Sequence, residues 1–347
     1  GNQETHPWDS HPADHQRIEH ALKQQEPAKF ICELPSSLLM NEFETLCEKH
    51  SLKIYNGTRD RKFDRFVRNN DILFKTKKQD EVSDERVKTL LMGIDLGQRI
   101  PNIPVKLPDN LMGASLTDIH SHFVSLNDRI KKCAFDYNQA RSKRYAHNQA
   151  NAYVQAGFNV DAKAFQLTNA ENKSVEQVLH ATEITYKNSE SDLACYDQLI
   201  TARINAFCKN KPNDILIQAR EHLKALKSIK NIEDNIEKSN IYSVCIDMLV
   251  EDEDQNPAIV DRINSYQIEL AEIIKDIWNR SKNISAVNRY SNERINLIDF
   301  SETWQKKPII ELEKLPAYKL ANYSQVLGDS IRKQYFLHLK ELVMIIQ

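Results

Sequence analysis

The chain has 347 residues, with 47 lysines and arginines against 49 aspartates and glutamates and only 7 glycines. A formal net charge of −2 argues against a global field for nucleic acid or an anionic membrane, and the scarcity of glycine disfavours tight hairpins and phosphate-binding loops. With 41% hydrophobic residues, a chain of this length buries a sizeable core, so we expect a mainly α-helical protein.

The proline-punctuated stretch 101–108 separates two kinds of sequence pattern. Its three prolines in eight residues prevent a continuous helix and favour extended backbone, so we place a domain boundary here. The predicted organisation is a His-rich segment at 1–27, a small α+β unit at 28–108, and a bundle of long helical hairpins with a coiled-coil seam at 109–347.

The N-terminal segment 1–27 is polar and rich in histidine. If Pro12 begins a helix, His11, His15 and Glu19 lie four residues apart on one face, where side chains can share a zinc ion. No nearby residue is an obvious partner to orient such ligands, and terminal segments of this kind often fray. We therefore favour a frayed segment over a metal site.

The unit at 28–108 is predicted to mix strands and helices. Short apolar runs and alternating patterns favour strands, one of them followed by Asn56-Gly57, a dipeptide suited to a tight turn. Helical periodicity and serine-led starts favour helices elsewhere. The expected elements are strands at 28–34, 52–55 and 71–77 and helices at 36–50 and 83–96.

Residues 53–78 are basic, with nine lysines and arginines against three aspartates and with four aromatic residues interleaved. Guanidinium groups bind phosphate, and aromatic rings stack on bases or enter a lipid interface, so phosphoinositide head groups, nucleotides and RNA are candidate ligands. We favour the alternative of a solvated face over core phenylalanines. If the basic segment 59–78 does bind a polyanion, the predicted contacts are Arg59, Arg61, Arg65 and Arg68.

Beyond residue 115 the apolar residues recur at intervals of three and four, which predicts long amphipathic helices. We expect helices at 115–156 and 173–209 to pair antiparallel. The side chains predicted to face inward are Phe123, Leu126, Ile130, Leu193 and Tyr196. A second basic cluster is predicted to form the outer face of this pair, and it contains Arg129, Lys131, Lys132, Arg141, Lys143 and Arg144.

Three further helices are predicted in the C-terminal part of the chain. Pro212 and Pro257 suit the first turn of a helix, and we expect these two helices to run to about 249 and 290. An amphipathic helix at 323–346 closes the bundle.

Asp118, His120 and His122 have a D-x-H-x-H spacing that resembles the metal-ligand motif of amidohydrolase-type barrels. The resemblance covers five residues, and these lie in a predicted helix rather than after an apolar strand. Positions i and i+2 of a helix point about 200° apart and cannot chelate one ion. We therefore predict a capped helix start with solvent-exposed histidines.

The six cysteines are at least 13 residues apart, so no C-x-x-C pair exists for zinc or redox chemistry. No apolar run is long enough to cross a bilayer, and the first residues lack the order of a signal peptide. We expect a protein that is cytoplasmic or delivered into a reducing cytosol.

Motifs for P-loop, α/β-hydrolase and zincin chemistry do not occur, and no cofactor is indicated. The favoured function is therefore a protein-interaction module that uses an elongated helical surface. Abundant Lys, Asn and Ile in long helices suggest a fragment of a bacterial effector that acts on host proteins. The alternatives are a phosphoryl-group or nucleotide enzyme, or a peripheral phosphoinositide-binding module, each centred on the basic segment 59–78.

Overall fold

The computed structural model describes residues 70–167, 174–251, 257–287, 295–297, 312 and 314–347, with scattered positions between 19 and 53. The fold is mainly helical, as the composition predicts. The chain divides into two compact units, Gly1–Leu73 and Phe74–Gln347. No helix among the described residues is long and apolar enough to span a membrane.

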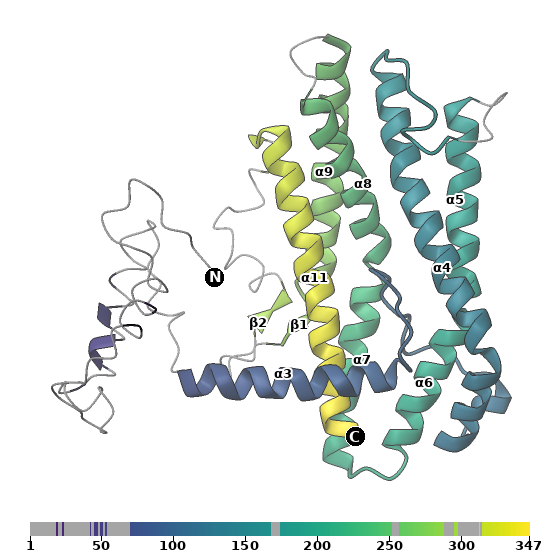
Figure 1. Ribbon diagram of the computed structural model, residues 1–347, viewed down its shortest axis with the longest axis vertical. Helices are drawn as coiled ribbons and strands as arrows, with labels where there is room; N and C mark the ends of the chain where they lie inside the picture. Colours follow the sequence, from purple (N-terminus) through teal and green to yellow (C-terminus); the bar gives the residue numbers. More distant parts are fainter. Residues whose placement is uncertain are drawn as a thin grey trace. The chain divides into compact units, whose positions relative to one another are not determined.

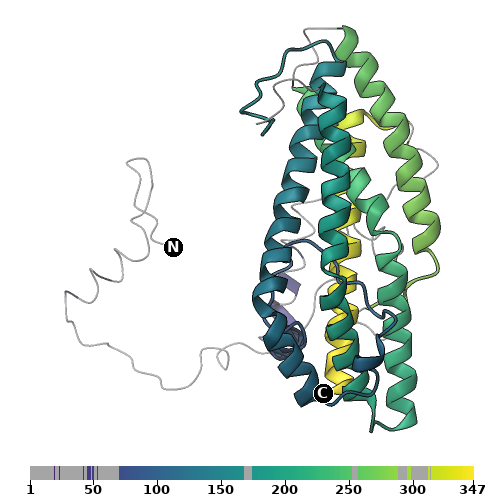
Figure 2. The same cartoon turned by 90° about the vertical axis from the view of Figure 1, so that its right-hand side faces the viewer.

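The second unit is a helical bundle (Figure 1). The helices α4 and α5 pack together, α8 packs on α9, and α11 lies against α7, α8 and α9, as both views of the chain show (Figures 1 and 2). Its elements are α3 (Asn70–Leu90), which begins in the first unit, η3 (Asp109–Leu111), α4 (Leu116–Gln155), α5 (Val175–Asp192), α6 (Ala194–Cys208), α7 (Asn213–Lys230), α8 (Glu233–Val250), α9 (Pro257–Ser281), β1 (Ser285–Ala286), β2 (Ile295–Asn296) and α11 (Ala317–Ile346).

The hairpin of α4 and α5 confirms the predicted antiparallel pair. The Ser115 side chain accepts a hydrogen bond from the backbone of Asp118 and begins α4, and Ser174 begins α5 in the same way. Tyr137 is hydrogen-bonded to Tyr186 at 3.1 Å, and on the next turns Arg144 reaches Glu183, so residue numbers rise on one helix as they fall on the other.

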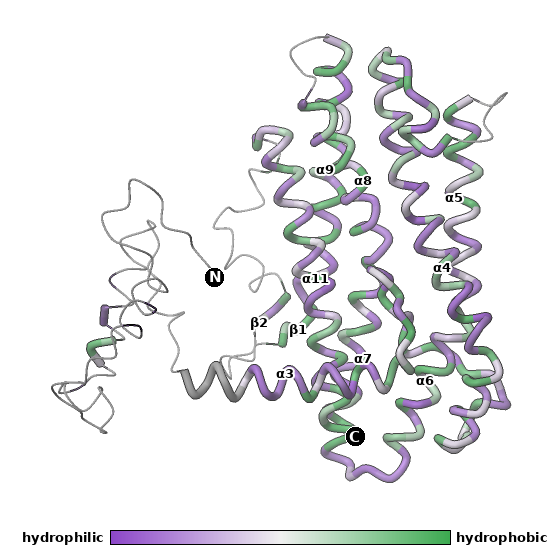
Figure 3. Tube along the Cα trace, in the orientation of Figure 1, coloured by the Kyte–Doolittle hydropathy of each residue, from purple (hydrophilic) through white to green (hydrophobic). Residues whose placement is uncertain are grey.

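The side chains predicted to face inward do so. Phe123, Ile130, Leu193 and Tyr196 are buried, and Leu126 packs against them from a partly buried position. Hydrophilic and hydrophobic residues mix along each helix of the bundle (Figure 3), as expected when each helix buries one stripe and exposes the other. The apolar seam therefore holds the hairpin together.

Two predicted helices are each divided in two. The helix expected at 173–209 is interrupted at Leu193, between α5 and α6, and the helix expected from Pro212 to about 249 is interrupted at 231–232, between α7 and α8. Neither break contains glycine or proline. Leu193 and Ile232 are buried, so core packing sets these breaks rather than backbone propensity.

The C-terminal helices begin close to where the prolines indicate. Pro257 is the first residue of α9, but this helix ends at Ser281 instead of near 290 because the chain enters β1. Strand β1 pairs antiparallel with β2, with Ser285 opposite Asn296. The closing helix α11 is confirmed and begins at Ala317, after Pro316.

The strand predicted at 71–77 is wrong, because these residues belong to α3. Thr76, Ser83, Val87 and Leu90 are buried at intervals of seven, four and three, which is helical spacing, and this pattern outweighs the short alternation. Ser83 does not cap a new helix, since its hydroxyl donates to the Asp80 carbonyl at 2.9 Å within α3.

The proline-rich stretch 101–108 is non-helical, as predicted, but it lies inside the second unit. Ile100 and Ile103 are fully buried, and the Tyr335 hydroxyl on α11 donates to the Pro101 carbonyl at 2.6 Å. Among the described positions of the first unit, Lys53 is helical, which contradicts the strand predicted at 52–55. Most of the predicted segment 1–27 lies outside the described residues, as does most of the predicted unit 28–108 before residue 70.

Candidate functional site

The sequence-based site residues are mostly outside the part of the chain that the structure describes. This holds for Arg59, Arg61, Arg65 and Arg68 and for His11 and His15, so the predicted polyanion and metal sites stay predictions. Glu19, the third candidate metal ligand, is exposed and forms an ion pair with Lys23 at 2.7 Å.

The D-x-H-x-H segment has the predicted helical structure. Asp118 is the third residue of α4, and hydrogen bonds from Ser115 lower the pKa of its carboxyl group. His120 is exposed and His122 partly exposed on the same helix. Over the described ranges, no three His, Cys, Asp or Glu side chains are grouped so that they hold a metal ion.

The second basic cluster only partly forms an outer face. Arg129, Lys131, Lys132 and Lys143 are exposed, as predicted. Arg141 and Arg144 instead point inward and pair with Glu237 at 3.0 Å and Glu183 at 2.6 Å. Their partners come from α8 and α5, so contacts distant in sequence decide their position.

Buried ion pairs join the helices at the centre of the second unit. Arg99 binds Asp197 through two hydrogen bonds of 2.8 and 2.6 Å, with both side chains at most 3% exposed. Glu237 pairs with Arg141 and also with Arg332 on α11. Arg332 also reaches Asp329 at 3.6 Å, so each of these arginines has a carboxylate partner, and we assign the pairs to positioning the helices rather than to ligand binding.

One cavity, of about 650 Å³, lies between the hairpin of α4 and α5 and the hairpin of α8 and α9. We call it the inter-hairpin groove. Its lining includes Asn148, His180, Lys238, Tyr242, Arg262 and Tyr266.

One wall of the groove contains two tyrosine rings, with an arginine guanidinium stacked over one of them. The rings of Tyr242 and Tyr266 meet edge to face with centroids 5.2 Å apart, and the Arg262 guanidinium lies 4.1 Å from the Tyr266 ring centroid. Cys245 also lines the groove, and burial raises the pKa of its thiol to about 12. The thiol is therefore neutral at physiological pH and behaves as a small apolar group.

Charge in the groove is only partly compensated. The lining contains three cations, Arg144, Lys238 and Arg262, against two carboxylates, Glu176 and Glu183. Arg144 pairs with Glu183, whereas Lys238 and Arg262 form no ion pair with a described carboxylate. Among the described atoms, Arg262 Nε and Asn151 Oδ1 are shielded from solvent without a hydrogen-bond partner. Each of these unpaired polar atoms is costly to bury.

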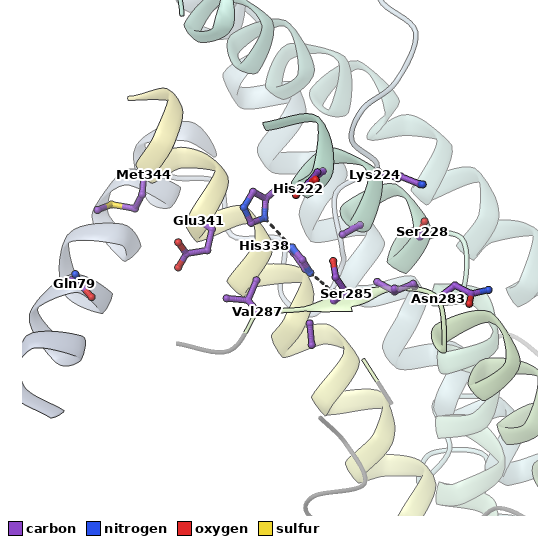
Figure 4. A pocket seen from close by; sticks show the side chains of 14 residues that line it. Gln79, His222, Lys224, Ser228, Asn283, Ser285, Val287, His338, Glu341 and Met344 are labelled. Atoms are coloured by element: carbon purple, nitrogen blue, oxygen red, sulfur yellow. Dashed lines mark hydrogen bonds between the residues drawn. The ribbon is translucent and has the colours of Figure 1, made fainter. Parts of the chain in front are cut away.

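A second cavity, also about 650 Å³, lies beside α7, α11 and β1 (Figure 4). At its centre, His222 Nδ1 lies 3.0 Å from His338 Nδ1, and His338 Nε2 lies 2.8 Å from the Ser285 carbonyl oxygen. Burial lowers the pKa of His338 to about 4 and also lowers that of His222. Both rings are therefore neutral at physiological pH.

The histidine pair was not predictable from local sequence. His222 and His338 are 116 positions apart, and each lies in a helical segment with no motif around it. Comparison with known proteins adds no assignment, because no family model, no curated protein and no solved structure matches the chain.

Proposed function

We propose that this chain is a protein-interaction module that binds a segment of another protein in the inter-hairpin groove. The observation that carries the proposal is the cluster of Tyr242, Tyr266 and Arg262 on the groove wall. Tyrosine and arginine are the residues that most often dominate binding energy at protein interfaces, because they combine apolar area with directed polar contacts.

The charge of the groove indicates the chemistry of the partner. Lys238 and Arg262 line the groove and form no ion pair with a described carboxylate. An acidic segment with an apolar or aromatic anchor matches this charge, since its carboxylates pair with the cations while its anchor packs beside Tyr242. Such a partner is consistent with the hypothesis of an effector fragment that acts on other proteins.

Peptide display against the immobilised full chain tests this proposal. We expect enrichment of peptides with aspartate or glutamate beside an apolar anchor. A synthetic copy should bind in solution, and Lys238→Glu should weaken binding at least about tenfold because it replaces attraction by repulsion. Lys209→Glu changes an exposed lysine outside the groove and should leave the affinity unchanged.

Two outcomes contradict the groove assignment. One is the absence of any enriched sequence class, and the other is equal binding by wild type and Lys238→Glu. The alternatives centred on the basic segment 59–78, an enzyme or a phosphoinositide-binding module, concern residues that are mostly outside the described structure and stay predictions.

A further inference from the structure

The hydrogen bonds of the His222 and His338 pair define which nitrogens carry protons. The Ser285 carbonyl only accepts hydrogen bonds, so His338 Nε2 donates to it at 2.8 Å and carries the proton of that neutral ring. His338 Nδ1 therefore carries no proton and has a free lone pair. It points to His222 Nδ1, 3.0 Å away, across the interface between α7 and α11 (Figure 4).

This arrangement of His338 is the one found in metal-binding histidines. Such a ring usually donates one N–H to a backbone carbonyl or a carboxylate, which fixes its orientation and directs the other nitrogen to the metal. His338 is 3% exposed, so its orientation is also fixed by packing. His222 is partly exposed beside the cavity and has room to exchange its tautomer.

The separation of the two Nδ1 atoms suits a shared ion. Metal–imidazole bonds are about 2.0–2.1 Å long, so two nitrogens on one ion lie roughly 2.9–3.4 Å apart. The observed 3.0 Å falls within this interval.

The geometry points to a binding site for a divalent transition-metal ion, with His222 Nδ1 and His338 Nδ1 as its two protein ligands. Imidazole pairs select borderline ions such as Zn²⁺, Ni²⁺ and Cu²⁺ over Mg²⁺ and Ca²⁺, which prefer oxygen. No third described side chain is placed to complete the site, so water fills the other positions and the coordination sphere is open.

Calorimetric titration of the full chain with Zn²⁺, Ni²⁺, Cu²⁺ and Mg²⁺ tests the inference. The background protein should carry His11→Ala and His15→Ala, because these residues are candidates for a separate site. We expect one equivalent of Cu²⁺ to bind more tightly than Ni²⁺ or Zn²⁺, and no Mg²⁺ to bind. His222→Ala should weaken Cu²⁺ binding at least about tenfold, because one of two ligands is lost.

The matched control is His120→Ala, which removes an exposed histidine of α4 outside both cavities and should leave the affinity unchanged. Electron paramagnetic resonance of the Cu²⁺ complex should show two coupled imidazole nitrogens, and one in His222→Ala. If that variant fails to fold, His222→Gln and the spectrum of the background protein serve instead. Absence of Cu²⁺ binding, or equal binding with and without His222, overturns the inference and leaves a purely structural hydrogen bond.

Discussion

Buried polar residues give this bundle its specificity at the scale of single side chains. Arg141 and Arg144 lie in a stretch of α4 that looks uniformly solvent-exposed in sequence, yet both turn inward to carboxylates on other helices. Burying an unpaired charge costs several kcal/mol, roughly, so each arginine fixes the position of its partner helix. Local charge patterning contains no information about such partners.

His338 makes stability depend on pH at the same scale. Its pKa is about 4 in the folded protein against an ordinary value of 6.5, so the unfolded chain binds this proton more tightly. The free energy of unfolding should therefore decrease as the pH falls from 6.5 toward 4, by roughly 3 kcal/mol over that window. Urea unfolding at several pH values, with a chelator present, measures this slope.

A matched pair of variants isolates the contribution of His338. His338→Gln retains a side-chain donor for the Ser285 carbonyl and does not titrate, so its pH slope should be shallower than that of wild type. His120→Gln changes an exposed histidine and should keep the wild-type slope. Equal slopes for both variants would show that other groups carry the pH dependence.

At the scale of elements, the long helices were predictable from their apolar periodicity, whereas short strands and the breaks between helices were less so. The seam that runs from Ile119 through Ile130 to Tyr137 spans several helical turns, so its period is unambiguous. The strand expected at 71–77 depended on seven residues, too few to distinguish the two periods. The breaks at Leu193 and 231–232 depend on tertiary packing, which the helix propensity of the local sequence does not report.

Ile130 tests the seam of the long hairpin. It is fully buried in α4, so Ile130→Asp removes core packing and buries an unpaired carboxylate. The free energy of unfolding should decrease by about 3–5 kcal/mol, measured by urea denaturation. Val124→Asp is the control, because Val124 is 60% exposed on the same helix and its loss should cost at most about 0.5 kcal/mol. Equal stability of the two variants would contradict the packing of this pair.

At the scale of the whole second unit, segments without helical structure are part of the core. The stretch from Arg99 to Val105 connects α6, α8 and α11 through buried contacts, since Ile100 N donates to Glu233 and Val105 N to Thr201. Prolines were a sound guide to where helices stop, but burial rather than backbone conformation decides whether such a segment separates two units. The two candidate sites also depend on tertiary contacts, because the groove and the histidine pair each combine residues from helices that are distant in sequence.

The Arg99 and Asp197 pair tests whether this segment and the helices unfold together. Either Arg99→Met or Asp197→Leu alone leaves a buried charge without its partner, and each should lower the free energy of unfolding by about 3–5 kcal/mol. The double variant replaces the pair by apolar side chains and should recover most of that loss, which urea denaturation of all four proteins measures. Hydrogen exchange at Ile100 and at the buried α8 residue Ile246 should slow and quicken in parallel across the series. Two results would mean that the segment unfolds separately from the helices. One is a double variant whose loss of unfolding free energy equals the sum of the two single losses, and the other is exchange at Ile100 that quickens while Ile246 stays protected.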